Sequence, residues 1–182
     1  MRKIGLIAVA AVLVGTFSGC YESKVPMATS EKSTIEPKLV GAWIQVMDEK
    51  DDGEPMFLIV AKLNEREYVV SWAKQDDDAT LTRAYSVKVG DVDIMNVQNI
   101  ASGVDDERTY VFFKYKVSAD GLLAVQILNG GHDLLEDKEF ATPAEFMTFM
   151  KKHVNEAKLF NEPITFKKNE NLELRIVERE DD

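Results

Sequence analysis

The chain has 182 residues, a formal net charge of −10 at pH 7 and one cysteine. The excess negative charge disfavours binding to nucleic acid phosphates and to anionic lipid headgroups, so no nucleic acid partner is expected. A single cysteine excludes an intramolecular disulfide and a cysteine-based metal cluster.

The first twenty residues have the layout of a bacterial export signal. Arg2 and Lys3 precede an apolar run, 4–14, and small residues follow it up to Cys20. A basic, then apolar, then small order is typical of a secretory signal peptide, here 1–19. An uncleaved transmembrane anchor is the alternative, but the run is short of the roughly 20 residues that a spanning helix needs.

The tetrapeptide FSGC, residues 17–20, resembles the lipobox of bacterial lipoproteins. The resemblance implies cleavage before Cys20 and attachment of fatty acids to this residue, which would hold the protein at a membrane through a covalent lipid. It also implies a place in the cell envelope. Because Tyr21 is not the aspartate that signals inner-membrane retention in many Gram-negative species, we expect the outer membrane, with the protein facing the periplasm.

Residues 20–37 are predicted to be the lipidated cysteine followed by a flexible tether. The segment is rich in Ser, Thr, Lys and Glu, contains two prolines and shows no hydrophobic period. Such composition is typical of a linker that lacks its own core. The globular domain is therefore expected at 38–178, with a charged tail at 179–182.

From Leu39 onward, apolar residues recur with a period of two, which indicates half-buried antiparallel strands. The apolar residues predicted to share one face of a strand are Tyr68, Val70 and Trp72; Leu81, Tyr85, Val87 and Val89; Val111, Phe113, Tyr115 and Val117; and Leu123, Val125 and Ile127. Gly-Asp at 90–91 and Asp-Gly at 120–121 are typical of tight hairpin turns.

One segment has helical spacing instead. Thr142, Pro143 and Glu145 form a predicted helix start with a capping box, and apolar residues then follow at intervals of three and four. After the helix, 163–168 and 172–177 are predicted to form a closing hairpin. Short gaps favour a meander of about eight or nine strands closed into a barrel, with a β-sandwich as the alternative.

Two further stretches resemble known families. Gly41-Ala42-Trp43 resembles the Gly-x-Trp motif that opens lipocalin-like (calycin) barrels, in which the tryptophan plugs one end. The stretches TPAEFMTFMKKH (142–153) and LFNEPITFK (159–167) resemble the ending of a group of uncharacterised bacterial lipoproteins. The resemblance implies a lipocalin-like fold and an envelope location. It also implies that a late basic residue covers Trp43, for which Lys167, Lys168 and Arg175 are the candidates.

Catalytic and metal motifs are missing from the sequence, so we predict no enzyme, cofactor or metal site. His153 ends the helix, where a structural role is favoured. His132 lies beside Asp133, and two ligands do not make a metal site. Three acidic clusters, 48–52, 76–78 and 105–107, are interpreted as solvated turns in preference to calcium loops.

Two functional hypotheses remain. The first is a module that binds a small apolar ligand inside the barrel. Trp43, Trp72, Tyr85, Phe112, Phe113 and Tyr115 could line its cavity, although a filled interior is favoured. The second is a tethered envelope scaffold or inhibitor that acts by protein–protein contact. It rests on the charge after signal removal, which becomes −12 when Arg2 and Lys3 are lost from −10.

Overall fold

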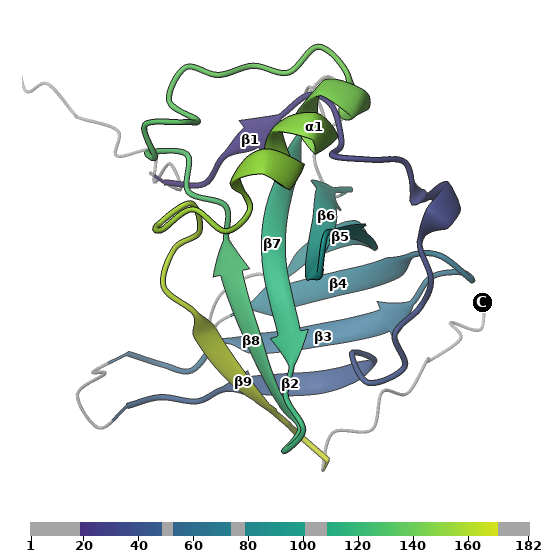
Figure 1. Ribbon diagram of the computed structural model, residues 1–182. Helices are drawn as coiled ribbons and strands as arrows, with labels where there is room; N and C mark the ends of the chain where they lie inside the picture. The colour runs from purple at the N-terminus through teal and green to yellow at the C-terminus, as the bar shows by residue number, and fades with distance from the viewer. Residues whose placement is uncertain (1–18, 49–52, 74–78, 101–108, 171–182) are drawn as a thin grey trace, which may run out of the picture.

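The chain forms a closed antiparallel barrel of eight strands (Figure 1). The computed structural model describes residues 19–48, 53–73, 79–100 and 109–170. Strands β2 to β9 pair in sequence order, and β9 pairs back with β2 to close the ring. The predicted meander barrel with one late helix is therefore confirmed, and the sandwich alternative is wrong.

The elements have the following bounds. They are β1 (Glu22–Ser23), the 3-10 turn η1 (Ser30–Lys32), β2 (Gly41–Gln45), β3 (Phe57–Lys62), β4 (Tyr68–Ala73), β5 (Thr80–Val89), β6 (Val92–Asn99), β7 (Tyr110–Val117), β8 (Leu122–Ile127), α1 (Pro143–His153) and β9 (Ile164–Lys168). The ninth strand, β1, lies outside the ring and pairs with β7. The glycines of the two predicted turns, Gly90 and Gly121, have φ of 62° and 82°, the left-handed region that glycine adopts without steric cost.

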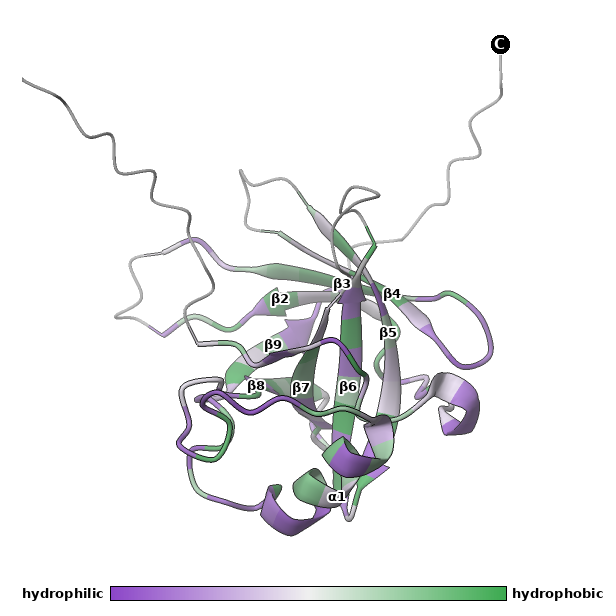
Figure 2. Cartoon of the chain, turned by 90° about the horizontal axis from the view of Figure 1, so that it is seen from above, coloured by the Kyte–Doolittle hydropathy of each residue, from purple (hydrophilic) through white to green (hydrophobic). Residues whose placement is uncertain are grey.

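The barrel wall has a core on each side. The inner core contains Trp43, Val60, Tyr68 and Phe166. The outer core lies between the wall and a cover made by α1 and the N-terminal segment (Figure 2). Tyr85, Val87 and Val89 belong to this outer core, whereas Ala84 faces the inner one. The predicted apolar face of β5 therefore points out of the barrel, where Leu81 is 41% exposed.

Helix α1 begins as predicted. The Thr142 hydroxyl oxygen accepts a hydrogen bond from the Glu145 N–H at 3.2 Å, and the Glu145 carboxylate accepts one from the Ala141 N–H at 3.1 Å. The first contact satisfies an N–H group that a helix start leaves without an intrahelical partner, and the second ties the residue before the cap to the first turn. The helix then buries Phe146 and Met150 completely against the barrel wall.

The predicted closing hairpin is wrong. Strand β9 pairs with β8 along one edge and with β2 along the other, so neither edge is free for a following strand. The proposed partner, 172–177, lies outside the described residues. Barrel closure has replaced the hairpin, because β2 satisfies the edge that the hairpin would have covered.

The prediction of a flexible tether at 20–37 is also wrong for the part that follows Cys20. Met27 is fully buried, and its N–H donates to the Asn96 side-chain oxygen at 2.8 Å. The Tyr85 hydroxyl donates to the Ala28 carbonyl at 2.7 Å. The segment thus packs along the barrel wall and covers part of the outer core.

Candidate functional site

The barrel encloses an apolar cavity of about 200 Å³. Six strands of the ring, β3, β4 and β6 to β9, contribute most of its wall, and Glu22 of β1 adds to it. The lining residues are Cys20, Glu22, Leu39, Met56, Leu58, Val60, Val70, Trp72, Met95, Val97, Val111, Phe113, Tyr115, Leu123, Val125, Ile127, Ile164 and Phe166. Almost all of these side chains are hydrocarbon, aromatic or thioether groups.

Two polar side chains of this wall, those of Tyr115 and Glu22, are already hydrogen-bonded. The Tyr115 hydroxyl lies 2.7 Å from the Ser86 hydroxyl, and burial raises the pKa of Tyr115 so that it stays protonated. At the rim, the Glu22 carboxylate accepts a hydrogen bond from the Thr109 hydroxyl at 2.9 Å. An apolar cavity with few unpaired polar groups is a poor site for water and a good one for an apolar molecule.

The prediction of a filled interior is therefore wrong in part. Three of the six candidate aromatic residues line the cavity, namely Trp72, Phe113 and Tyr115. Trp43 belongs to the inner core without lining the cavity, and Tyr85 and Phe112 lie in the outer core. The six candidate aromatic side chains are therefore divided between the two faces of the barrel wall. Because some of them pack outside the barrel, the interior stays partly hollow.

The Gly-x-Trp motif occupies one end of the barrel. Trp43 is 1% exposed, and its indole N–H donates to the Leu39 carbonyl at 2.9 Å. The Lys168 ammonium lies 5.4 Å from the centre of the Trp43 ring, within cation–π range. Gly41 has a φ of 143°, and a Cβ atom there would lie 2.7 Å from the Lys168 Cε.

These contacts explain the spacing of the motif. A glycine at position 41 allows the Lys168 stem to cross it and reach the tryptophan ring. Of the three predicted basic candidates, Lys168 is the one that lies over Trp43. Lys167 pairs with Ile44 one register position away, and Arg175 is outside the described residues.

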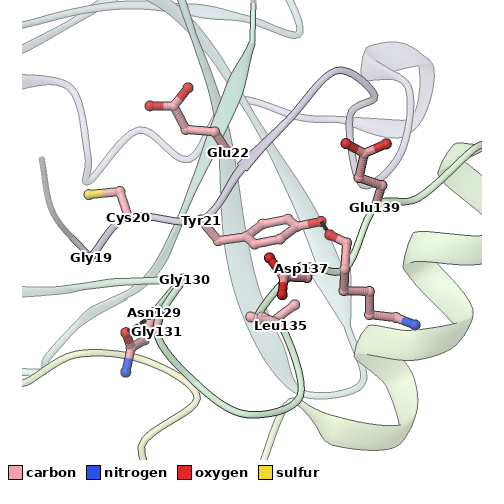
Figure 3. Close-up of a pocket in the computed structure, with 11 residues that line it drawn as sticks. Gly19, Cys20, Tyr21, Glu22, Asn129, Gly130, Gly131, Leu135, Asp137 and Glu139 are labelled. Carbon is pink, nitrogen blue, oxygen red and sulfur yellow. Dashed lines mark hydrogen bonds between the residues drawn. The ribbon is translucent and has the colours of Figure 1, made fainter. Parts of the chain in front are cut away.

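Cys20 lies at the opposite end of the barrel, beside Asn129 and Gly130 (Figure 3), which follow β8 in the chain. It forms an antiparallel bridge with Asn129. On either side, the Tyr21 N–H donates to the Leu128 carbonyl and the Gly130 N–H donates to the Gly19 carbonyl, each at 2.9 Å. Cys20 lines both the interior cavity and an open surface hollow of about 730 Å³.

The environment of Cys20 disfavours a reactive thiolate. Burial and, to a lesser degree, the Glu22 carboxylate raise the pKa of the Cys20 thiol. A protonated thiol is a weak nucleophile, and no cationic group is among the causes of this shift. This environment therefore does not activate the Cys20 thiol as a nucleophile.

Tyr21 holds Cys20 in place. Its ring is 6% exposed and contacts Phe140 and Phe146 edge-on, with ring centres 6.1 and 5.7 Å away. Its hydroxyl donates to the Lys138 carbonyl at 2.6 Å (Figure 3). Burial raises the pKa of Tyr21 to about 12, so the hydroxyl remains a donor at all physiological pH values.

The two histidines have structural contacts. In His132, Nδ1 accepts from the Leu134 N–H at 3.2 Å and Nε2 lies 3.2 Å from the Ala157 carbonyl, so one neutral tautomer satisfies both. The His153 ring packs on Phe149 at 4.7 Å. Within the described ranges there is no cluster of three or more possible metal ligands. The acidic segments 76–78 and 105–107 lie outside those ranges, as does most of 48–52.

Several lining residues were missed by the sequence reasoning. Met95 and Val97 of β6 were not assigned to a face, because Ile94 beside them is also apolar and hides the period of two. Glu22 was assigned to the tether. A search for strands that are apolar on both faces would have found β6, whereas no local signal marks Glu22.

No helix in the part of the chain that the structure describes is long and apolar enough to cross a membrane. Comparison with protein-family models, with curated proteins and with solved structures finds no match to this chain. The interior cavity and the position of Cys20 are therefore the features from which a function can be inferred.

Proposed function

We propose that this protein is a lipid-anchored envelope protein that binds a small apolar molecule inside its barrel. The apolar cavity of about 200 Å³ carries the proposal. Apolar cavities of about 150 Å³ stay dry and bind benzene-sized molecules, so a cavity of this size suits a small aromatic or a short length of hydrocarbon chain. Glu22 is the one charged group among its described lining residues, which favours a neutral ligand.

The anchor and the location are part of the same proposal. The lipobox resemblance at 17–20 supports fatty acylation of Cys20 and an outer-membrane position facing the periplasm. The Trp43 and Lys168 arrangement supports the resemblance to lipocalin-like barrels. We propose binding without catalysis, because the lining combines an inert thiol with hydrocarbon groups and offers no nucleophile paired with a base.

Filling the cavity is expected to abolish ligand binding. Val125 lines the cavity from β8, and Val125→Phe places a ring in the space that a ligand would occupy. We expect binding of the neutral fluorescent dye N-phenyl-1-naphthylamine to weaken by more than about tenfold, or about 1.4 kcal/mol. The measurement is a dye titration of residues 20–182, which contain every element that the structure describes.

The matched control is Leu63→Phe, which adds the same ring at a site that is 48% exposed and does not line the cavity. This variant should bind the dye as the wild type does. Equal binding by wild type and Val125→Phe would contradict a ligand site in the interior. Failure of the wild type to bind any of a panel of apolar molecules would do the same, and would favour the alternative of a partner protein.

Acylation of Cys20 has its own test. In cells given labelled palmitate, we expect the label to enter the wild-type protein and to be absent from Cys20→Ser produced at the same level. Cys20 is the only cysteine of the chain, so no other thiol can carry the label. Label in the Cys20→Ser protein, or none in the wild type, would refute the anchor.

A further inference from the structure

The two ends of the barrel differ in what they carry. In this antiparallel ring the β2–β3, β4–β5, β6–β7 and β8–β9 connections share one end. Cys20 lies at that end, because it bridges Asn129 directly after β8. The pair of Trp43 and Lys168 lies at the other end, where β9 finishes. We call the end with Cys20 the mouth, since Cys20 and Glu22 line the cavity there.

Cys20, the proposed anchor point, has a fixed position relative to the mouth. Cleavage before Cys20 would remove Gly19, but the Tyr21 N–H directly after the anchor still donates to the Leu128 carbonyl at 2.9 Å. Tyr21 is buried, and Met27 further along is fully buried. A lipid on Cys20 would therefore fix the orientation of the barrel as well as its distance from the membrane, which a flexible tether would not do.

Two exposed apolar side chains also lie at the mouth end. The described residues include three large exposed hydrophobic side chains. Val46 follows β2 and is 43% exposed, and Leu81 begins β5 and is 41% exposed. Both positions lie at the mouth end, where Val46 donates to the Thr165 carbonyl near the start of β9. The third, Leu63, follows β3 at the opposite end.

The protein is acidic, and the acidic segments 48–52, 76–78 and 105–107 belong in sequence to the β2–β3, β4–β5 and β6–β7 connections of this same end, so electrostatic attraction to anionic headgroups does not explain membrane contact. Contact must come from acyl chains on Cys20 and from apolar side chains beside them. Both are at the mouth, and the cavity begins at Cys20 itself. An apolar chain leaving the bilayer at this point would reach the cavity without crossing water.

We propose that the mouth faces the bilayer and that the cavity takes up part of an acyl chain from a membrane lipid. This inference rests on the proposed function, since it names the ligand class of the same cavity and the route by which the ligand enters. Trp72 lines the cavity and Trp43 does not, so the two tryptophans of the chain report on the cavity and on the far end.

The test uses the lipidated protein, purified from membranes of cells that express the full-length chain and reconstituted in phosphatidylcholine vesicles. Vesicles with brominated acyl chains, which quench tryptophan on contact, are compared with unbrominated ones. The wild type reports both tryptophans, and Trp72→Phe reports Trp43 alone. We expect brominated chains to remove most of the emission contributed by Trp72 and to leave that of Trp43 nearly unchanged.

A linker variant separates orientation from mere proximity. Twelve Gly and Ser residues inserted between Cys20 and Tyr21 add a coil that spans roughly 20 Å, while the buried Tyr21 and the barrel stay as they are. We expect this insertion to abolish most of the Trp72 quenching. Quenching that survives the insertion would overturn the proposed orientation.

Other outcomes would also overturn the inference. Equal quenching of both tryptophans would mean that the mouth does not face the bilayer. If the anchor's own acyl chain filled the cavity, Trp72 would escape quenching, and the lipidated protein would fail to bind the dye that unlipidated Cys20→Ser binds. In both cases dye binding by the unlipidated chain, tested separately, would leave the proposed function standing.

Discussion

Replacing Phe146 by alanine is expected to lower the free energy of unfolding by about 3–5 kcal/mol, the usual cost of deleting a fully buried aromatic ring. The Phe146 side chain is completely buried. Its ring stacks on Phe140 at 4.1 Å and meets Phe112 of the barrel wall edge-on at 4.8 Å. Deleting it opens a cavity between α1 and the wall that the surrounding rings can fill only in part. Urea unfolding followed by circular dichroism measures the loss.

Phe149→Ala is the matched control, because it removes the same ring from the same helix at a half-buried position. It should cost clearly less. A smaller loss for Phe146→Ala than for Phe149→Ala would contradict an outer core centred on Phe146. Since Tyr21 also packs on Phe146, the variant should additionally loosen the segment that positions Cys20.

Acidification is expected to remove up to about 3 kcal/mol of stability through one side chain, Glu67. Hydrogen bonds from Arg83 are the main cause that lowers the pKa of the Glu67 carboxylate from its ordinary 4.5 to about 2, with Asn64 adding to the effect and burial opposing it. Glu67 is 5% exposed but the Arg83 side chain is 43% exposed, so solvent screens part of the attraction between them. Each pKa unit corresponds to about 1.4 kcal/mol.

The direction of the change in stability with pH follows from the direction of the pKa shift of Glu67. A carboxylate with a depressed pKa in the folded state stabilises it fully above pH 4.5, and this contribution is lost as the pH falls toward 2. Unfolding free energies measured across this range should fall less steeply for Glu67→Gln than for the wild type. Glu65→Gln, at a neighbouring carboxylate that is 87% exposed, should follow the wild type. Identical slopes for Glu67→Gln and the wild type would refute the assignment.

Local patterns predicted the elements well because their causes are local. The period of two located β4, β5, β7 and β8, and the cap at Thr142 located the start of α1. The segment after Cys20 was wrongly predicted because its contacts are with residues far away in the chain. Its buried residues, Tyr21 and Met27, are isolated in a polar stretch, and Tyr21 finds its partner Lys138 at a separation of 117 residues. No periodic signal accompanies single contacts of this kind.

The candidate site, too, could be predicted from the sequence only where its causes are local. Gly41 and Trp43 were recognised from their spacing, but choosing Lys168 over Lys167 required the register of β9 against β2. The hollow interior could not be predicted, since a cavity of about 200 Å³ is the small space left when side chains of six strands have packed. Exchanging one lining residue, as Val125→Phe does, is enough to change it.

The amino-acid sequence by itself determined the strand alternation, the helix start and the Gly-x-Trp motif around Trp43, because each depends on neighbours within a few positions along the chain. Only the tertiary structure decided that the ring closes through β9 and β2, that Tyr85, Val87 and Val89 of β5 pack outside the barrel, and that Cys20 lies at the mouth of an apolar cavity. These features arise from contacts between residues far apart in the chain, whose free energy depends on how all the surrounding side chains pack.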